Sequence, residues 1–330
     1  MKIGIIDFNI SGIGGAPVAT KEIFYSFSNS LLFEKVILLT ETEIKDRPEI
    51  LQNFDLLHLP VLGSSSERQM EEKPLIIKIL EDSEKPFTVD LRASWDMEIY
   101  PFSSELLNNK KCKAIVTISK DLQKFYKKKL KRKIYFIDQW RTLSVPNILP
   151  KKKNKVVCFS RITPSKCIHE FALCCKEINA ECLCYGPINY QDYFNLFKDC
   201  ENFSYKGELL GETEIINALL DAKFVIDLST FENDGDRLQF TLLEGMTLNC
   251  IPVMKKQWFG RLEDNKNGIM IDKITDIPKK INSLLLNENL QNSIINNNKK
   301  ILKKKFNKNT GVKKYMQIFE KIREEMNEKY

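Results

Sequence analysis

The sequence predicts an α/β protein with two doubly wound domains, each a parallel sheet covered by helices on both faces. Short apolar, β-branched runs alternate with longer stretches of helical periodicity, which is the pattern of a parallel sheet with helical crossovers. The alternation stops once near the middle of the chain and then restarts. The length of 330 residues is also that of two domains.

The first half opens with a β-branched run at residues 2–7, typical of a buried parallel strand. A glycine-containing loop at 11–15 and a helix at 16–31 follow. Ser119 stands where an N-cap is expected and predicts a helix over 121–129. The other predicted strands of this half are 35–39, 56–59, 87–91, 114–118 and 134–137.

A break falls at residues 145–155, where two prolines precede a run of lysines. It predicts an N-terminal domain of residues 1–145 and a C-terminal domain of residues 146–330. From about residue 276 the chain is expected to be helical and basic. The predicted strands of the second half are 156–160, 181–185, 203–205, 224–228 and 251–254, and its predicted helices are 165–178, 190–197, 212–222 and 240–248.

Composition and charge exclude several classes of protein. The hydrophobic content of 43% argues against whole-chain disorder. The net charge of +7 permits a polyanionic partner without requiring one. Asp7 interrupts the apolar start where a signal peptide would continue, and no apolar run approaches the ~18 residues of a membrane span. We therefore expect a cytoplasmic protein with no membrane span, although contact with a membrane surface stays open.

The nine cysteines show no spacing typical of a zinc site, and the chain has only two histidines. Seven of the cysteines fall between Cys158 and Cys200. The pattern favours reduced cysteines in the core of a cytosolic protein. We expect no metal ion.

Gly12, Gly14 and Gly15 precede the first predicted helix. Glycines let a backbone approach a phosphate, and a helix N-terminus favours an anion. A dinucleotide-binding motif would need glycine where the chain has Pro17, which disfavours a nicotinamide site. A simple turn and a loop that faces a sugar or an acceptor both stay open.

Arg161 and Lys166 follow the first strand of the second half. A lysine at a helix start opposes the helix dipole unless an anion lies there too. An arginine and a lysine together suit a diphosphate, the one as a planar fork and the other as a mobile charge. The alternative interpretation is two solvated charges.

Three other side chains are candidate site residues because a predicted strand or loop ends beside each of them. Glu244 is predicted at a helix start, where its carboxylate would accept from ribose hydroxyls or merely complement the helix dipole. Asp90 lies at a strand end, close to Arg92, and indicates either a functional site or a surface loop with its own ion pair. His58, at another strand end, is either a residue of the cleft or a structural histidine.

Taken together and in this order, these motifs resemble those of GT-B glycosyltransferases, in particular glycosyltransferase family 4. The resemblance is strongest over residues 155–271. It implies two Rossmann-like domains facing a central cleft, an acceptor domain at the N-terminus and a nucleotide-sugar donor domain at the C-terminus. We also expect the final helix, about residues 312–330, to pack back on the N-terminal domain.

The resemblance assigns roles by position. Arg161 and Lys166 match the pair that holds the donor diphosphate, and Glu244 matches the acid that binds the donor ribose. The family's other acid lies eight positions earlier, at Asp236, although Glu232 is an alternative because the loop is longer here. The implied catalytic residues are Asp90, Arg161 and Lys166, and the implied donor-binding residues are Gly14, Gly15, Arg161, Lys166, Tyr185, Asp236, Thr241, Leu242 and Glu244.

Within this family, residues 237–244 are similar to a segment of the DNA α-glucosyltransferases of T-even bacteriophages. This likeness implies a retaining enzyme that transfers a sugar, with glucose favoured, from a UDP-sugar such as UDP-glucose. The favoured acceptor is a hydroxymethylated pyrimidine in phage DNA, which makes double-stranded DNA with modified bases a candidate partner and host cytoplasm the location.

Four basic clusters bear on the acceptor. They would suit DNA phosphates or an acidic membrane surface, or they are ordinary solvated lysines. A glycosyltransferase acting on a cell-surface glycan or a lipid-linked sugar therefore stays open. So does a non-catalytic relative that binds nucleotide-sugar or DNA. The clusters lie at residues 127–129, 131–133, 151–155 and 303–305.

Overall fold

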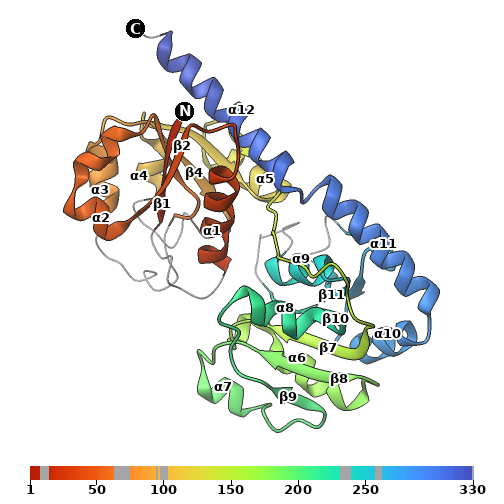
Figure 1. Ribbon diagram of the computed structural model, residues 1–330. Coiled ribbons are helices and arrows are strands. Elements are labelled where there is room, and N and C mark those ends of the chain that lie inside the picture. The colour runs from red at the N-terminus through yellow and green to blue at the C-terminus, as the bar shows by residue number, and fades with distance from the viewer. Residues whose placement is uncertain are drawn as a thin grey trace. The chain divides into compact units, whose positions relative to one another are not determined.

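The computed structural model describes residues 1–7, 15–62, 75–93, 96, 103–230, 239–256 and 262–328. The chain forms two compact units (Figure 1). Unit 1 contains residues 1–140 and 308–330, and unit 2 contains residues 141–307. The C-terminal segment therefore belongs to the same unit as the N-terminus.

Unit 1 is built on a six-stranded parallel sheet in the order β2-β1-β3-β4-β5-β6. Its strands are β1 (Lys2–Asp7), β2 (Lys35–Thr40), β3 (Leu56–Leu59), β4 (Phe87–Leu91), β5 (Cys112–Thr117) and β6 (Ile134–Phe136). Its α-helices are α1 (Gly15–Ser28), α2 (Glu41–Asp46), α3 (Leu75–Asp82), α4 (Ser103–Asn108), α5 (Lys120–Lys129) and α12 (Lys308–Asn327), and a 3-10 helix, η1, spans Pro48–Asn53.

Helices cover both faces of this sheet. Neighbouring residues of a strand point to opposite faces, and so Ile5 and Ile6 of β1 enter different cores. Ile5 packs with residues of α1 and α12, whereas Ile6 packs with residues of α2 to α5. Ser119 caps α5, because its side chain accepts a hydrogen bond from the backbone of Leu122 at 3.0 Å.

Unit 2 repeats the design with a parallel sheet in the order β12-β11-β10-β7-β8-β9. Val156 and Val157 of β7 enter separate cores on its two faces. The strands are β7 (Lys153–Phe159), β8 (Glu181–Tyr185), β9 (Phe203–Tyr205), β10 (Ala222–Asp227), β11 (Ile251–Lys255) and β12 (Ile269–Ile271). The helices are η4 (Pro164–Lys166), α6 (Ile168–Cys174), η5 (Cys175–Glu177), α7 (Gln191–Asn195), α8 (Glu212–Leu220), α9 (Phe240–Thr247), α10 (Asp276–Leu285) and α11 (Glu288–Lys304).

The fold confirms the predicted α/β class, with two corrections. The helix predicted over 165–178 is divided into η4, α6 and η5, and the break between η4 and α6 falls at Cys167, which adopts a left-handed conformation with φ of 50°. The three-residue strand β12 was not predicted from the sequence. All nine cysteines are free, and eight of them are buried.

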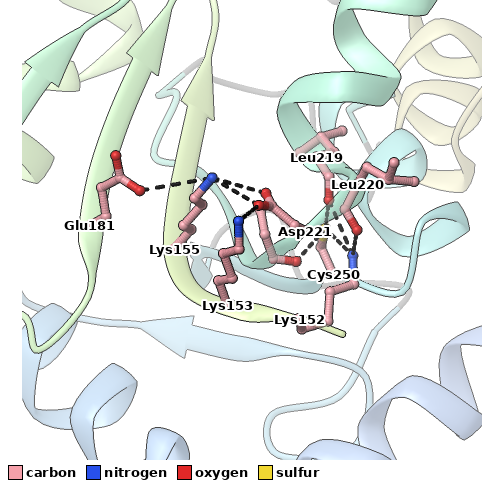
Figure 2. Close-up of polar contacts among 9 residues, drawn as sticks. Lys152, Lys153, Lys155, Glu181, Leu219, Leu220, Asp221 and Cys250 are labelled. Carbon is pink, nitrogen blue, oxygen red and sulfur yellow. Dashed lines mark hydrogen bonds and ion pairs between the residues drawn. The ribbon is translucent and has the colours of Figure 1, made fainter. Parts of the chain in front are cut away.

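Three lysines form hydrogen bonds and ion pairs at the amino end of the unit 2 sheet, as Figure 2 shows. The amine of Lys152 donates to the carbonyls of Leu219 and Leu220, the last residues of α8, at 3.1 and 3.0 Å. Carbonyls in the last turn of a helix lack the usual amide donor four residues further on, and a cation there also complements the helix dipole. Lys153 and Lys155 both pair with Asp221, at 2.9 and 3.0 Å.

These contacts change the ionisation of the groups involved. Burial lowers the pKa of Lys152. Burial alone would raise the pKa of Asp221, but hydrogen bonds from Lys153 and Lys155 outweigh it and lower that pKa. Three lysines of the predicted basic cluster at 151–155 are thus engaged within the chain. At this end of the sheet the lysines stabilise the fold. In a doubly wound sheet, ligands bind at the opposite, carboxyl end.

No helix among the described residues is both long and apolar enough to cross a membrane.

Candidate functional site

The strand order of unit 2 changes direction at one point. Strand β7 lies at the centre of the sheet, with β8 on one side and β10 on the other. The chain therefore winds outward in both directions from β7, and the carboxyl ends of the strands at such a switch point, here β7 and β10, are where doubly wound sheets bind ligands. Arg161 follows β7, and Ser229 follows β10.

The loop that carries Arg161 is fixed against the loop after β8. The Ser160 amide donates to the Tyr185 carbonyl at 3.0 Å, and the Ile162 amide donates to the Pro187 carbonyl at 2.8 Å. Gly186 makes the close approach possible: its φ is +137°, and a Cβ at this position would lie 1.9 Å from the Ser160 carbonyl oxygen. Tyr185, a predicted donor-binding residue, is thus part of the scaffold that positions Arg161.

Lys166 ends η4, and its amine reaches the end of β10. Its Nζ donates to the hydroxyl of Ser229 at 3.1 Å. Ser229 is fully buried, and both its hydroxyl and its amide donate to Asp227, the amide at 2.9 Å. The Thr230 amide also donates to the Ser165 carbonyl at 2.8 Å. Asp227 and Ser229 thereby orient Lys166 at the switch point.

The sequence analysis did not predict Asp227 or Ser229 as site residues. Both follow a buried β-branched run, at the position where polar side chains mark the carboxyl end of a strand. This signal is present in the sequence but is weak, because neither residue stands beside an opposite charge in the sequence.

Glu244 lies in the second turn of α9 and not at its start, which corrects the predicted position. The residue is 2% exposed, and its Oε1 accepts from Nε of Arg141 at 2.6 Å. A buried carboxylate needs such a partner to stay ionised. The following residue, Gly245, lets α9 pack closely, since a Cβ there would lie 2.3 Å from Cγ1 of Val225 in β10.

The remaining predicted donor-binding residues differ in their surroundings. The Thr241 hydroxyl donates to the Phe159 carbonyl at the end of β7, at 3.3 Å. Leu242 is fully buried, and its side chain packs in the core. Gly15 is the exposed first residue of α1 in unit 1. Gly14, Glu232 and Asp236 lie outside the described residues.

Asp90 belongs to a buried polar cluster within unit 1. It is 1% exposed, and its Oδ2 accepts from the Tyr315 hydroxyl of α12 at 2.6 Å and from Arg92 at 3.1 Å. Fully buried His58 bonds to the Thr88 hydroxyl at 2.8 Å through Nδ1. Its Nε2 lies 3.7 Å from Oδ1 of Asp90. His58 is therefore a core residue, as one of its two interpretations expected.

Burial shifts the two titratable groups of this cluster in opposite directions. It raises the pKa of Asp90 to about 7, although Arg92 and Tyr315 oppose the change. It lowers the pKa of His58 to about 3, and the charge of Arg92 adds to this effect. Between about pH 4 and 6.5 the folded protein holds Asp90 protonated and His58 neutral. The unfolded chain holds the reverse, an ionised Asp90 and a protonated His58. Each state therefore binds one proton, and the pH dependences of the two contributions to stability cancel, although both contributions are unfavourable.

Single substitutions should expose these hidden pH dependences. In Asp90→Asn only His58 remains, with its pKa lowered on folding, and stability should fall as pH falls from about 6.5 to about 3. In His58→Gln only Asp90 remains, with its pKa raised, and stability should fall as pH rises from about 4 to about 7. Each slope approaches about 1.4 kcal/mol per pH unit. Urea unfolding across pH measures them, and identical profiles for both variants would refute the account.

Among the described residues, no group of three or more histidine, cysteine, aspartate or glutamate side chains could hold a metal ion. Unit 2 places Arg161 just after β7 and Lys166 at Ser229, just after β10, while Glu244 lies in α9, whose Thr241 contacts the end of β7. Cations at the ends of these strands are suited to bind a phosphorylated ligand, and a carboxylate is suited to accept hydrogen bonds from hydroxyl groups.

No protein-family model matches the chain, and no curated protein matches it in sequence. Its structure is similar to that of the Anabaena protein HepE solved with UDP-glucose. The TM-score is 0.72 and the identity 13%, over 98% of this chain and 100% of HepE. A glycosyltransferase of Rickettsia africae gives a TM-score of 0.70 at 16% identity, over 97% of this chain and 98% of that one.

A phage α-glucosyltransferase, solved with UDP and a 13-mer DNA containing an HMU base, gives a TM-score of 0.68 at 12% identity. The likeness spans 96% of this chain and 99% of that one. These likenesses extend over nearly the whole chain, and the structures concerned are GT-B glycosyltransferases. The protein therefore has the GT-B fold, as the sequence predicted.

Proposed function

We propose that the protein is a nucleotide-sugar-dependent glycosyltransferase that uses a UDP-sugar, with UDP-glucose the favoured donor. One observation carries the proposal: Arg161 and Lys166 lie at the carboxyl ends of β7 and β10, at the switch point of a GT-B chain. The similar structures solved with UDP or UDP-glucose support the choice of donor.

In this proposal Arg161 and Lys166 bind the donor diphosphate. Sugar transfer passes through an oxocarbenium-like transition state while negative charge grows on the leaving diphosphate. Fixed cations stabilise that charge without having to reorganise. Lys166 fits the role because Asp227 and Ser229 hold its amine in place before any donor arrives. We propose transfer with retention, as the resemblance to family 4 implies.

Glu244 is proposed to accept hydrogen bonds from the ribose hydroxyls of the donor. The ion pair with Arg141 favours the ionised form of Glu244. An ionised carboxylate has about four lone-pair sites that accept hydrogen bonds from donors such as hydroxyls. The catalytic role of Asp90 stays a prediction, and within unit 1 its carboxyl accepts from Tyr315 and Arg92.

The proposed acceptor is a hydroxymethylated pyrimidine in double-stranded DNA. The likeness to the phage enzyme solved with DNA supports it. The lysines at 127–129, together with Lys131 and Lys133, are exposed at the end of α5, where they could contact phosphates. The target base would have to leave the stack to be glycosylated. Such an enzyme would act in the cytoplasm of the host cell.

A glycan or lipid-linked acceptor is the second candidate. The chain also resembles the S. aureus protein TarM, solved with α-GlcNAc-glycerol and UDP, with a TM-score of 0.62 at 18% identity. That likeness spans 80% of this chain and 55% of TarM. The exposed lysines of α5 would equally attract an acidic membrane surface.

The test is transfer of radiolabelled sugar from a panel of UDP-sugars to a duplex containing hydroxymethylcytosine, with the unmodified duplex as control. Label in the modified duplex alone would support the DNA acceptor and identify the donor. Slow donor hydrolysis without DNA labelling would retain the glycosyltransferase and favour the glycan or lipid acceptor. Tight binding of UDP-sugar with neither hydrolysis nor transfer would contradict an active enzyme and favour a non-catalytic relative.

A further inference from the structure

Arg141 forms a buried ion pair with the carboxylate proposed to bind the donor ribose. We propose that Arg141 is a positioning residue for ribose recognition, because it fixes the orientation and charge of Glu244. The inference rests on the proposed function, since it needs a nucleotide at this site. Arg141 belongs to none of the sequence motifs described above.

The contact is short and almost completely shielded from water. Nε of Arg141 lies 2.6 Å from Oε1 of Glu244, and the two side chains are 9% and 3% exposed. At this burial an unpartnered carboxylate would be costly and would tend to take up a proton. A protonated Glu244 would lose much of its strength as an acceptor of ribose hydroxyls, because hydrogen bonds to a charged group are the stronger ones. Arg141 prevents that loss.

Arg141 is itself held in place by its neighbours. Its Nη1 donates to the Thr142 carbonyl at 2.8 Å and lies 3.5 Å from Oε2 of Glu212, near the start of α8. The same glutamate accepts from the Ser144 amide at 2.8 Å. Leu143 and Val145 pack against the core formed by α8 and α9. These contacts fix the orientation of the Arg141 guanidinium, and Glu244 therefore has an ion-pair partner in a fixed position.

The position of Arg141 in the chain gives the contact a second consequence. It is the first residue of unit 2, and the preceding Trp140 is anchored in unit 1, where its Nε1 donates to the Ser26 hydroxyl at 2.9 Å. The segment that joins the units is thus tied directly to Glu244. Binding of a ribose at Glu244 and the ordering of this segment should therefore be coupled.

The experiment compares the affinities of UDP and 2′,3′-dideoxy-UDP by calorimetry, because their ratio reports ribose recognition alone. Wild-type protein should prefer UDP by about 10- to 100-fold, the range expected for hydrogen bonds to a charged group. Arg141→Gln should reduce the preference to a few-fold at most, and Arg141→Lys, which keeps the charge but loses the fixed planar donor, should reduce it by a smaller factor. Glu244→Gln should also reduce it to a few-fold at most, and the double variant Arg141→Gln/Glu244→Gln should lose no more than either single variant.

Glu177→Gln is the matched control, since it neutralises an exposed acid of η5 in the same unit and leaves Arg141, Glu212 and Glu244 untouched. It should keep the full preference. Thermal melting identifies any variant that fails to fold, and Arg141→Lys, which retains the charge, keeps the test decisive if Arg141→Gln unfolds.

The outcomes separate the two claims. Full ribose preference in both Arg141 variants, with loss in Glu244→Gln, would overturn the positioning role and leave the proposed function intact. Full preference in Glu244→Gln would overturn the ribose assignment itself, and the inference with it. Failure of wild-type protein to bind UDP would contradict the proposed function.

Discussion

Replacing Lys166 with alanine should lower kcat/KM for the UDP-sugar by about 10²- to 10³-fold, the cost of removing one fixed charge-stabilising group from an active site. The fall should be mainly in kcat, because the leaving diphosphate gains negative charge in the transition state. The fold should be unaffected, since Lys166 is only partly buried. Initial-rate measurements of donor hydrolysis or transfer would show this.

Two further variants sharpen the result. Arg161→Ala should have an effect of similar size, because it removes the second cation of the pair. Lys176→Ala is the matched control, an exposed lysine of η5 in the same unit, and it should leave the rates unchanged. Wild-type rates in both Lys166→Ala and Arg161→Ala would contradict the diphosphate assignment.

Tyr315→Ala should destabilise unit 1 by about 3–5 kcal/mol, the range for truncating a buried aromatic side chain. Tyr315 is 2% exposed and packs against the rings of Phe27, His58 and Trp140, at centroid distances of 5.3, 5.3 and 6.2 Å. It also supplies a hydrogen bond to Asp90. Chemical denaturation monitored by circular dichroism measures the loss.

Tyr315→Phe separates packing from the hydrogen bond. It keeps the ring and removes only the donor to the buried Asp90, and it should cost about 1–3 kcal/mol. The account would be contradicted if Tyr315→Ala cost less than about 1 kcal/mol, because α12 would then contribute little to the core of unit 1.

The fold was predictable because its signals are local. The β-branched runs of β1 and β7 and the N-cap at Ser119 can be read within a few residues, and the structure confirms each of them. The break at Cys167 was not predictable from periodicity, since a left-handed residue other than glycine leaves no mark in the apolar pattern.

The candidate site could be predicted only for charged residues whose order and spacing in the sequence resemble those of a known family. Arg161 and Lys166 are five residues apart in the sequence. Their supports are not local: Ser229 lies 63 residues from Lys166, and Arg141 lies 103 residues from Glu244. Tyr315, whose hydroxyl donates to Asp90, lies 225 residues from it. Such contacts arise from the strand order and the helix packing, and a single sequence does not specify which distant polar residues meet.

We propose above all that unit 2 binds a nucleoside diphosphate through Lys166 at the carboxyl ends of β7 and β10. Its most direct test is a calorimetric titration of UDP into wild-type protein, Lys166→Ala and Lys176→Ala. The account predicts binding of one UDP per chain to wild-type protein and to Lys176→Ala with the same affinity, and at least tenfold weaker binding to Lys166→Ala. Absence of UDP binding to wild-type protein, or equal affinity in all three proteins, would contradict it.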